Sequence, residues 1–248
     1  MRIIISPAKK MNINTDSLDW NGLPQFLSEA EAIKNCLQKK TSQDLQALWK
    51  CNDSIAAVNV ERLRSMDLKR NLTPAILAYE GIQYQYMAPN VFETGHLDYI
   101  LQHLRILSGF YGLLRPFDGV VPYRLEMQAK LAMGGSKDLY DYWGNKLAKQ
   151  LCAETDFVLN LASREYSRAV TEYLPKEVRL VTCIFGEQKD GRIIEKGTIC
   201  KMSRGQMVRW LAEHNVSDPG DIREFNKLGY AYSEEHSAQN ILVFIKRP

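Results

Sequence analysis

The amino-acid sequence predicts an α/β (mixed α+β) fold, in which one domain covers residues 1–248 and a mixed sheet is surrounded by helices. Three observations support this: an apolar β-branched run near the start, helical spacing over residues 24–72, and a hairpin signal at Asp190-Gly191. The chain has 248 residues, of which 45% are hydrophobic, so it is long enough to bury a sizeable core. We therefore expect a single compact unit.

Two predicted strands each end in a serine that is followed by cations. Residues 2–5 form an apolar run that stops at Ser6-Pro7, before Lys9 and Lys10. Residues 157–163 form a second buried run, and Arg164 follows it. Ligands of open α/β sheets bind outside the carboxyl ends of the strands. If the two strands are parallel neighbours, we expect their ends to line one crevice.

Helical spacing recurs over residues 24–72, with a second helix starting after Thr41. A further helix is predicted from Pro74 to near Gly81, and residues 137–147 are typical of a helix interrupted at Gly144. We expect these segments to act as scaffold.

A glycine-bearing segment in the middle of the chain has the outline of a helix-hairpin-helix element. Residues 97–107 keep helical periodicity, and Gly109 and Gly112 follow in a short loop before Pro116. Such a hairpin binds phosphate through backbone N–H groups that glycine leaves accessible. The three-residue spacing of the glycines and the early proline depart from the usual pattern, and a plain helix C-cap at Gly109 is the alternative.

A β-hairpin is predicted from residues 179–188 and 192–202, closed by Asp190-Gly191 in a type I′ turn. Pairing Lys189 with Arg192 places Cys183 and Cys200 diagonally on one face of the hairpin. That separation is long for an unstrained disulfide. We therefore expect two packed thiols in preference to a redox switch.

A helix start is predicted directly after this hairpin. Ser203 lies three residues before Gln206, which is the spacing of a capping box. Lys201, Arg204 and Arg209 surround this predicted N-terminus, where free N–H groups and the helix dipole favour an anion such as phosphate. The alternative is an ordinary surface helix with solvated arginines.

Composition excludes several classes of protein. The net charge of +3 is too mild for a dedicated nucleic-acid module, so any such role depends on local clustering of cations. We find no secretory signal and no apolar run of about 18 residues, and we expect a cytoplasmic protein. Five cysteines without a C-x-x-C pair favour reduced thiols. Nucleotide-binding, hydrolase and metalloprotease motifs are missing, so we predict no catalytic residue, no metal and no cofactor.

The sequence resembles the bacterial peroxide stress protein YaaA family along essentially its whole length. The motifs that carry the likeness are residues 5–9, 107–116, 122–127, 160–163 with Glu165-Tyr166, 203–205, and Phe225-Asn226 with Gly229-Tyr230. The resemblance implies an unusual single-domain fold with a helix-hairpin-helix-like element beside a positively charged cleft. It also implies binding of double-stranded DNA and a role in lowering free iron and DNA damage under peroxide. The candidate DNA- or phosphate-binding residues are Lys9, Lys10, Arg105, Gly109, Gly112, Arg115, Arg124, Arg164, Lys201, Arg204 and Arg209.

We expect a protein, most simply a monomer, that binds double-stranded DNA by its phosphates with little base reading. One alternative is an enzyme acting on a small phosphorylated or nucleotide-like substrate in the same cleft, and another is a basic surface that meets an acidic partner. A closed pocket with a buried, pKa-shifted carboxylate beside Lys9 favours the enzyme, whereas an open basic groove favours DNA. A basic cleft shared by these segments requires Lys9 and Arg204 to lie on the same side of the molecule.

Overall fold

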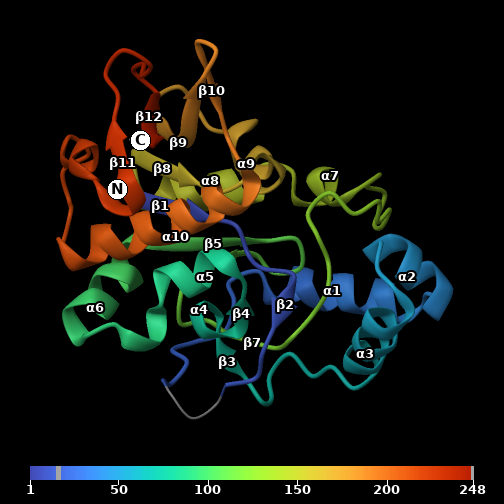
Figure 1. Cartoon of the computed structure of the whole chain (residues 1–248). Helices are drawn as coiled ribbons and strands as arrows, with labels where there is room; N and C mark the ends of the chain where they lie inside the picture. Colours follow the sequence, from blue (N-terminus) through green and yellow to red (C-terminus); the bar gives the residue numbers. More distant parts are fainter. Residues whose placement is uncertain (15–17, 247–248) are drawn as a thin grey trace.

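A computed structural model describes residues 1–14 and 18–246 and contains one main mixed sheet with helices on both faces (Figure 1). The order of the strands along the sheet is β11-β12-β9-β8-β1-β5-β6, with β10 paired to β9. The bounds are β1 Arg2–Ile5, β5 Leu104–Ser108, β6 Gly112–Leu114, β8 Phe157–Leu161, β9 Arg179–Lys189, β10 Arg192–Ile194, β11 Tyr230–Tyr232 and β12 Ile241–Lys246. The mixed α/β single-domain prediction is confirmed.

The centre of the sheet is parallel and its edges are antiparallel. Strand β1 pairs in parallel with β5 on one side and β8 on the other, and β8, β9 and β12 continue the parallel order. Strands β6, β10 and β11 pair antiparallel to their neighbours. Ile3, Ile4 and Ile5 are fully buried because helices cover both faces of a parallel sheet. The carboxyl ends of β1 and β8 therefore lie side by side.

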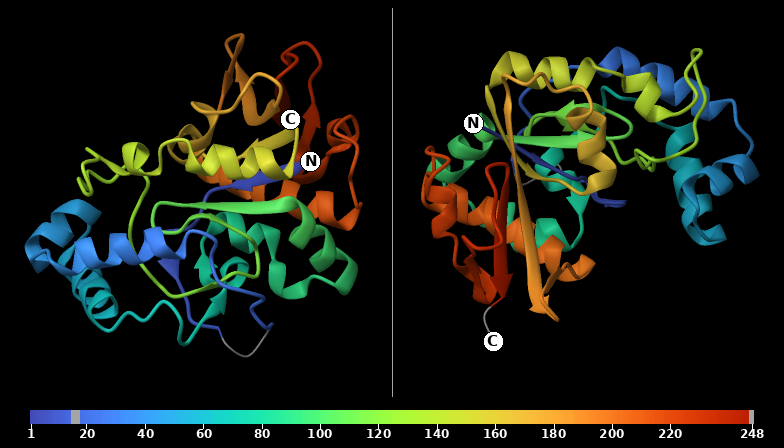
Figure 2. Two further views of the ribbon diagram at one scale, coloured as in Figure 1. Left: turned by 180° about the vertical axis from the view of Figure 1, so that it is seen from behind. Right: turned by 90° about the horizontal axis from the view of Figure 1, so that it is seen from above.

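Helices form two layers and a lateral group. Helix α10 lies on one face of the sheet and α8 on the other, while α1, α2 and α3 extend to one side (Figures 1 and 2). The bounds are α1 Leu27–Gln38, α2 Ser42–Trp49, α3 Asp53–Arg64, α4 Ala75–Ala78, α5 Ile82–Met87, α6 Thr94–His103, α7 Leu139–Trp143, α8 Lys146–Glu154, α9 Arg164–Thr171 and α10 Gly197–Glu213. Short strand pairs β2 (Lys10–Met11) with β4 (Tyr79–Glu80) and β3 (Thr73–Pro74) with β7 (Gly119–Val120) tie the α4 region to the core.

Several predicted elements are confirmed where local chemistry decides them. Thr41 caps α2 in a capping box with Asp44. Gly144 has a φ of +47° and separates α7 from α8, as its position between two helical patterns predicts. Asp190 and Gly191 both have positive φ and close the β9–β10 hairpin in the predicted register, Lys189 opposite Arg192. No helix among the described residues is long and apolar enough to cross a membrane.

Candidate anion-binding site

The carboxyl ends of β1 and β8 are joined by two serines. Because β1 and β8 are parallel neighbours, with Ile5 opposite Leu161, Ser6 comes to lie beside Ser163. The Ser6 Oγ accepts the Ser163 backbone N–H at 2.8 Å and donates to the Ser163 Oγ at 3.2 Å. On the other side, the Tyr84 hydroxyl donates to the Ser6 carbonyl at 3.1 Å. The prediction that these two strand ends share one crevice is confirmed.

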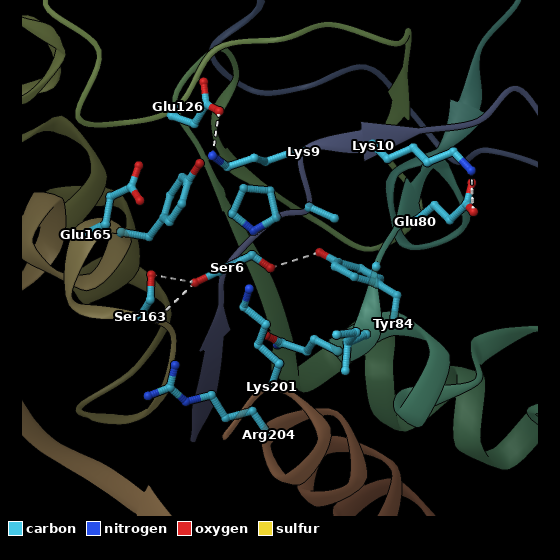
Figure 3. Close-up of a pocket in the computed structure, with 16 residues that line it drawn as sticks. Ser6, Lys9, Lys10, Glu80, Tyr84, Glu126, Ser163, Glu165, Lys201 and Arg204 are labelled. Carbon is cyan, nitrogen blue, oxygen red and sulfur yellow. Dashed lines mark hydrogen bonds and ion pairs between the residues drawn. The ribbon is translucent and has the colours of Figure 1, made fainter. Parts of the chain in front are cut away.

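A cavity of about 400 Å³ opens beside these two strand ends and is lined by cations from separate parts of the chain (Figure 3). Lys9 and Lys10 reach it from the segment after β1, and Lys201 and Arg204 from α10. Lys201 and Arg204 are three positions apart in a helix, which places them on the same face. Lys9 and Arg204 thus lie on the same side of the molecule, as a shared cleft requires.

Two of the four cations are already paired with carboxylates. The Lys9 Nζ lies 3.1 Å from Glu126, and the Lys10 Nζ lies 2.6 Å from Glu80. Both lysine side chains are otherwise largely exposed, so the pairs are weak and the lysines can turn toward a ligand. We call Lys9 and Lys10 the lysine rim of the cavity.

The other two cations, together with Gln83 of α5, leave unpaired donors at the cavity. Among the residues that the structure describes, Lys201 has no ion-pair partner, and Arg204 reaches Glu195 only at 3.8 Å. The Arg204 Nε and the Gln83 Nε2 are buried without a hydrogen-bond partner among those residues. Gln83 lines the cavity and is 7% exposed. Buried unpaired donors carry a desolvation cost that an anionic ligand would remove. We call Gln83, Lys201 and Arg204 the donor wall.

The predicted helix start at Ser203 is wrong. Helix α10 begins at Gly197, so Ser203 lies inside the helix and its side chain is fully buried. The predicted second strand of the hairpin ends at Ile194, far short of Met202. The Ser203 to Gln206 spacing imitates a capping box, but Ser203 is a buried residue inside the helix, and Gly205 allows the close approach of α10 to α5. Lys201 and Arg204 therefore act from a helix face and not from a helix N-terminus.

Two carboxylates face the donor wall from the opposite side of the cavity (Figure 3). Glu126 is 8% exposed and is held by Lys9 and by Arg124, whose guanidinium lies 3.4 Å away. Glu165 of α9 is half-buried, and burial, reinforced by the nearby Glu126 charge, raises the pKa of its carboxyl. These acids, like Gln83, were not among the predicted site residues. Glu126 and Glu165 do lie within the sequence motifs that carry the family resemblance.

The predicted helix-hairpin-helix element is also wrong. Helix α6 ends at His103, and the following residues form the antiparallel strands β5 and β6, all of them buried. A Cβ at Gly109 would lie 2.8 Å from the Leu125 carbonyl oxygen, and one at Gly112 would lie 2.8 Å from the Trp143 ring. The two glycines allow close packing inside the core and present no backbone N–H groups to DNA. The leucine-rich run suits a buried strand as well as a helix, which explains the error.

Arg105 and Arg115 lie near the amino end of β5, whereas the cavity lies at the carboxyl ends of β1 and β8. Arg105 is near the start of β5, where the residue is 5% exposed and its guanidinium donates to Glu154 at 2.7 Å. Arg115 follows β6 and lines a separate pocket with Arg105, Asp118 and Glu154. The prediction that one cleft contains these arginines as well as Lys9 is therefore wrong, because β5 runs parallel to β1 and Arg105 precedes Ser108 along it.

Three other predicted cations do not line the cavity. Arg124 is mostly buried against Glu126 and positions that carboxylate. Arg164 is exposed at the start of α9, directly between the cavity residues Ser163 and Glu165. Arg209 lies farther along α10 and pairs with Glu213 at 2.6 Å. Of the predicted set, the structure brings together Lys9, Lys10, Lys201 and Arg204.

The two core cysteines do not share a hairpin face, because Cys200 belongs to α10 while Cys183 belongs to β9. Burial raises the pKa of Cys183 to about 12 and that of Cys200 to about 11. The Cys200 thiol donates to the Phe185 carbonyl at 3.3 Å. Since the thiolate is the reactive form, both thiols are suited to packing.

We expect neither Cys183 nor Cys200 to react with hydrogen peroxide or iodoacetamide in the folded protein at pH 7.5. Mass spectrometry of labelled peptides should find modification at Cys36, Cys51 and Cys152, which are partly exposed, well before these two. Unfolding in denaturant should make all five cysteines reactive. Rapid labelling of Cys200 in the folded protein would contradict this prediction.

Comparison with known proteins places the chain in a family. The family model described as peroxide stress protein YaaA matches residues 1–236. A UPF0246 protein of Lachnoclostridium phytofermentans is 52% identical over 246 residues, covering 99% of this chain and 96% of the relative. Another, of Desulfitobacterium hafniense, is 53% identical over 246 residues, covering 99% and 98%, and one of Agathobacter rectalis is 47% identical over 247, covering 100% and 99%. This chain therefore belongs to the peroxide stress protein YaaA family.

Proposed function

We propose that this member of the peroxide stress family binds double-stranded DNA in the cytoplasm through its backbone phosphates, and so limits iron-dependent oxidative damage to DNA. The observation that carries the proposal is the donor wall, whose unpaired donors adjoin the lysine rim. Phosphate oxygens are strong acceptors that satisfy such donors. Contacts of this kind position a protein on DNA without reading its sequence.

The geometry favours contact at a single point along the backbone. A B-form duplex, whose major groove alone is about 12 Å wide, cannot enter a cavity of this volume. The phosphates must therefore approach the mouth, where Lys9, Lys10 and Lys201 are exposed. The net charge of +3 also favours a small number of ion contacts over a wide electrostatic footprint.

We expect duplex affinity, measured by fluorescence anisotropy over a series of salt concentrations, to fall linearly on a log–log plot. Lys201→Ala should weaken binding about equally for unrelated sequences and reduce the salt slope by about 1, because one phosphate contact is lost. Lys201 is exposed, so the variant should fold normally.

Arg115→Ala is the matched control, since it removes an exposed cation that lines a separate pocket. Its affinity and salt slope should equal those of the wild type. Binding that is insensitive to salt, or an equal loss in both variants, would refute the proposal.

A second candidate function is an enzyme acting on a small phosphorylated or nucleotide-like substrate. It is favoured by the half-buried Glu165 carboxyl, whose raised pKa and position near Lys9 suit a general acid or base. The same donor wall would hold the phosphate of such a substrate. Turnover that is lost in Glu165→Gln while phosphate binding is kept would establish this function.

A further inference from the structure

The cavity has two chemically different walls, of which phosphate binding uses one. The donor wall consists of Gln83, Lys201 and Arg204. The carboxylates Glu126 and Glu165 lie across the cavity from Lys201 and Arg204 (Figure 3). A phosphate group and a carboxylate are both negatively charged and repel each other. A ligand that fits the whole cavity carries an anion at one end and N–H donors at the other.

Glu165 is the carboxylate with free acceptor capacity. Glu126 is occupied by Lys9 and Arg124, whereas no cation lies within ion-pair distance of Glu165 among residues 1–14 and 18–246. Its Oε1 accepts the Gln128 backbone N–H at the long distance of 3.4 Å, and the Met127 backbone also hydrogen-bonds this carboxylate. The remaining lone pairs of this carboxylate can accept hydrogen bonds from donors on a ligand.

Most of the surface that lines the cavity is apolar. Pro7, Tyr84 and Tyr166 line it, and the Tyr84 hydroxyl is already engaged by the Ser6 carbonyl. Flat aromatic ligands pack well on such surfaces. The volume of about 400 Å³ is near the lower end of the range for small-ligand pockets, about 300–1,000 Å³.

We propose that the cavity holds one nucleotide unit, with its phosphate on Gln83, Lys201 and Arg204 and the donor edge of its base on Glu165. Guanine suits this carboxylate best, because its Watson–Crick edge carries two adjacent N–H donor groups. The inference rests on the proposed phosphate binding and deepens it. The unit comes either from a base extruded from duplex DNA or from a free mononucleotide.

Extrusion is tested with three duplexes of one sequence: fully paired, with guanine opposite an abasic analogue, and with thymine opposite the same analogue. A 2-aminopurine beside the variable position reports unstacking by its fluorescence. Since an unpaired base costs less to extrude, the guanine duplex should bind roughly tenfold more tightly than the paired one and show the fluorescence rise. The thymine duplex should gain less.

Glu165→Gln should abolish the preference for unpaired guanine over the paired duplex, about a tenfold loss. The matched control is Glu172→Gln, at the other end of α9, where the carboxylate pairs with the exposed Arg168 and is remote from the cavity lining. It should keep the preference. The same two variants are compared for binding of dGMP and dTMP by calorimetry.

The outcomes separate the two proposals. Preference for unpaired guanine that depends on Glu165 supports extrusion, and dGMP binding that depends on Glu165 without this preference supports a free nucleotide. If neither appears while the paired duplex binds with the expected salt dependence, the nucleotide inference is overturned and DNA binding stands. If the paired duplex does not bind but dGMP does, DNA binding fails and the nucleotide site stands.

Discussion

Gly205→Ala is expected to destabilise the protein by about 3 kcal/mol, because a side chain at this position collides with backbone. A Cβ on Gly205 would lie 2.0 Å from the Gln83 carbonyl oxygen and 3.1 Å from the Met87 backbone nitrogen. Backbone atoms cannot rotate away, so α5 and α10 must separate. The gain in helix propensity, about 1 kcal/mol, is smaller than this cost. Thermal unfolding should show a melting temperature lower by about 6–12 °C.

Gly197→Ala is the matched control in the same helix. Nothing lies within 4 Å of a Cβ at Gly197, so this variant should be as stable as the wild type or slightly more stable. The Gly205 variant should also lose duplex affinity, since the crossing of α5 and α10 positions Gln83 and Arg204. A Gly205 variant with unchanged melting temperature would show that the two helices are not held at this contact.

Glu154→Ala is expected to cost about 3–5 kcal/mol, because it leaves a buried guanidinium without its counter-ion. The Glu154 Oε2 accepts from the Arg105 Nε at 2.7 Å and from the Arg2 Nε at 2.9 Å. The Arg105 side chain is 6% exposed and that of Glu154 is 12% exposed. Denaturant unfolding followed by circular dichroism measures the loss. Glu172→Ala, which breaks an exposed pair, should have almost no effect.

The same network predicts an acid-dependent loss of stability. Burial by itself raises the pKa of Glu154, but hydrogen bonds from Gln150, Arg2 and Arg105 outweigh it and hold the pKa below the usual 4.5. A carboxyl with a depressed folded-state pKa stabilises the fold above its unfolded-state pKa and loses that contribution as pH falls through the folded value. The difference between wild type and Glu154→Ala should therefore shrink below about pH 4.5. A difference that grows on acidification would contradict this assignment.

These two contacts have different relations to the cavity. Gly205 lies where α10 contacts α5 beside the donor wall, whereas Glu154 pairs with Arg105 near the amino end of β5. A functional assay on both variants under conditions where they remain folded should find DNA binding impaired in the first and retained in the second. The arginines that the sequence groups into one phosphate site thus divide between Arg204, which lines the cavity, and Arg105, which is buried and pairs with Glu154.

Much of the architecture is readable from local sequence. The isoleucine run and Pro7 predict where β1 ends, and Asp190-Gly191 predicts the hairpin turn, because single residue types impose these backbone conformations. The sequence also predicts that Ser6 and Ser163 follow the ends of two strands, which is confirmed. Residues 97–107 show the limit, since a run of leucines suits either a helix or a strand buried on both faces, and pairing of β5 with β1 decides between them.

The sequence by itself determined the mixed α/β class, the family, the strands β1, β8 and β9 and the turn that follows β9, because periodicity, turn residues and motifs are local properties. Tertiary structure decided which cations share a site. The parallel pairing of β1 with β8 brings Ser6 to Ser163, and the close contact of α5 with α10 at Gly205 brings Gln83 beside Arg204. Such contacts join residues far apart in the chain, and their energies depend on distance and burial, which sequence spacing does not contain.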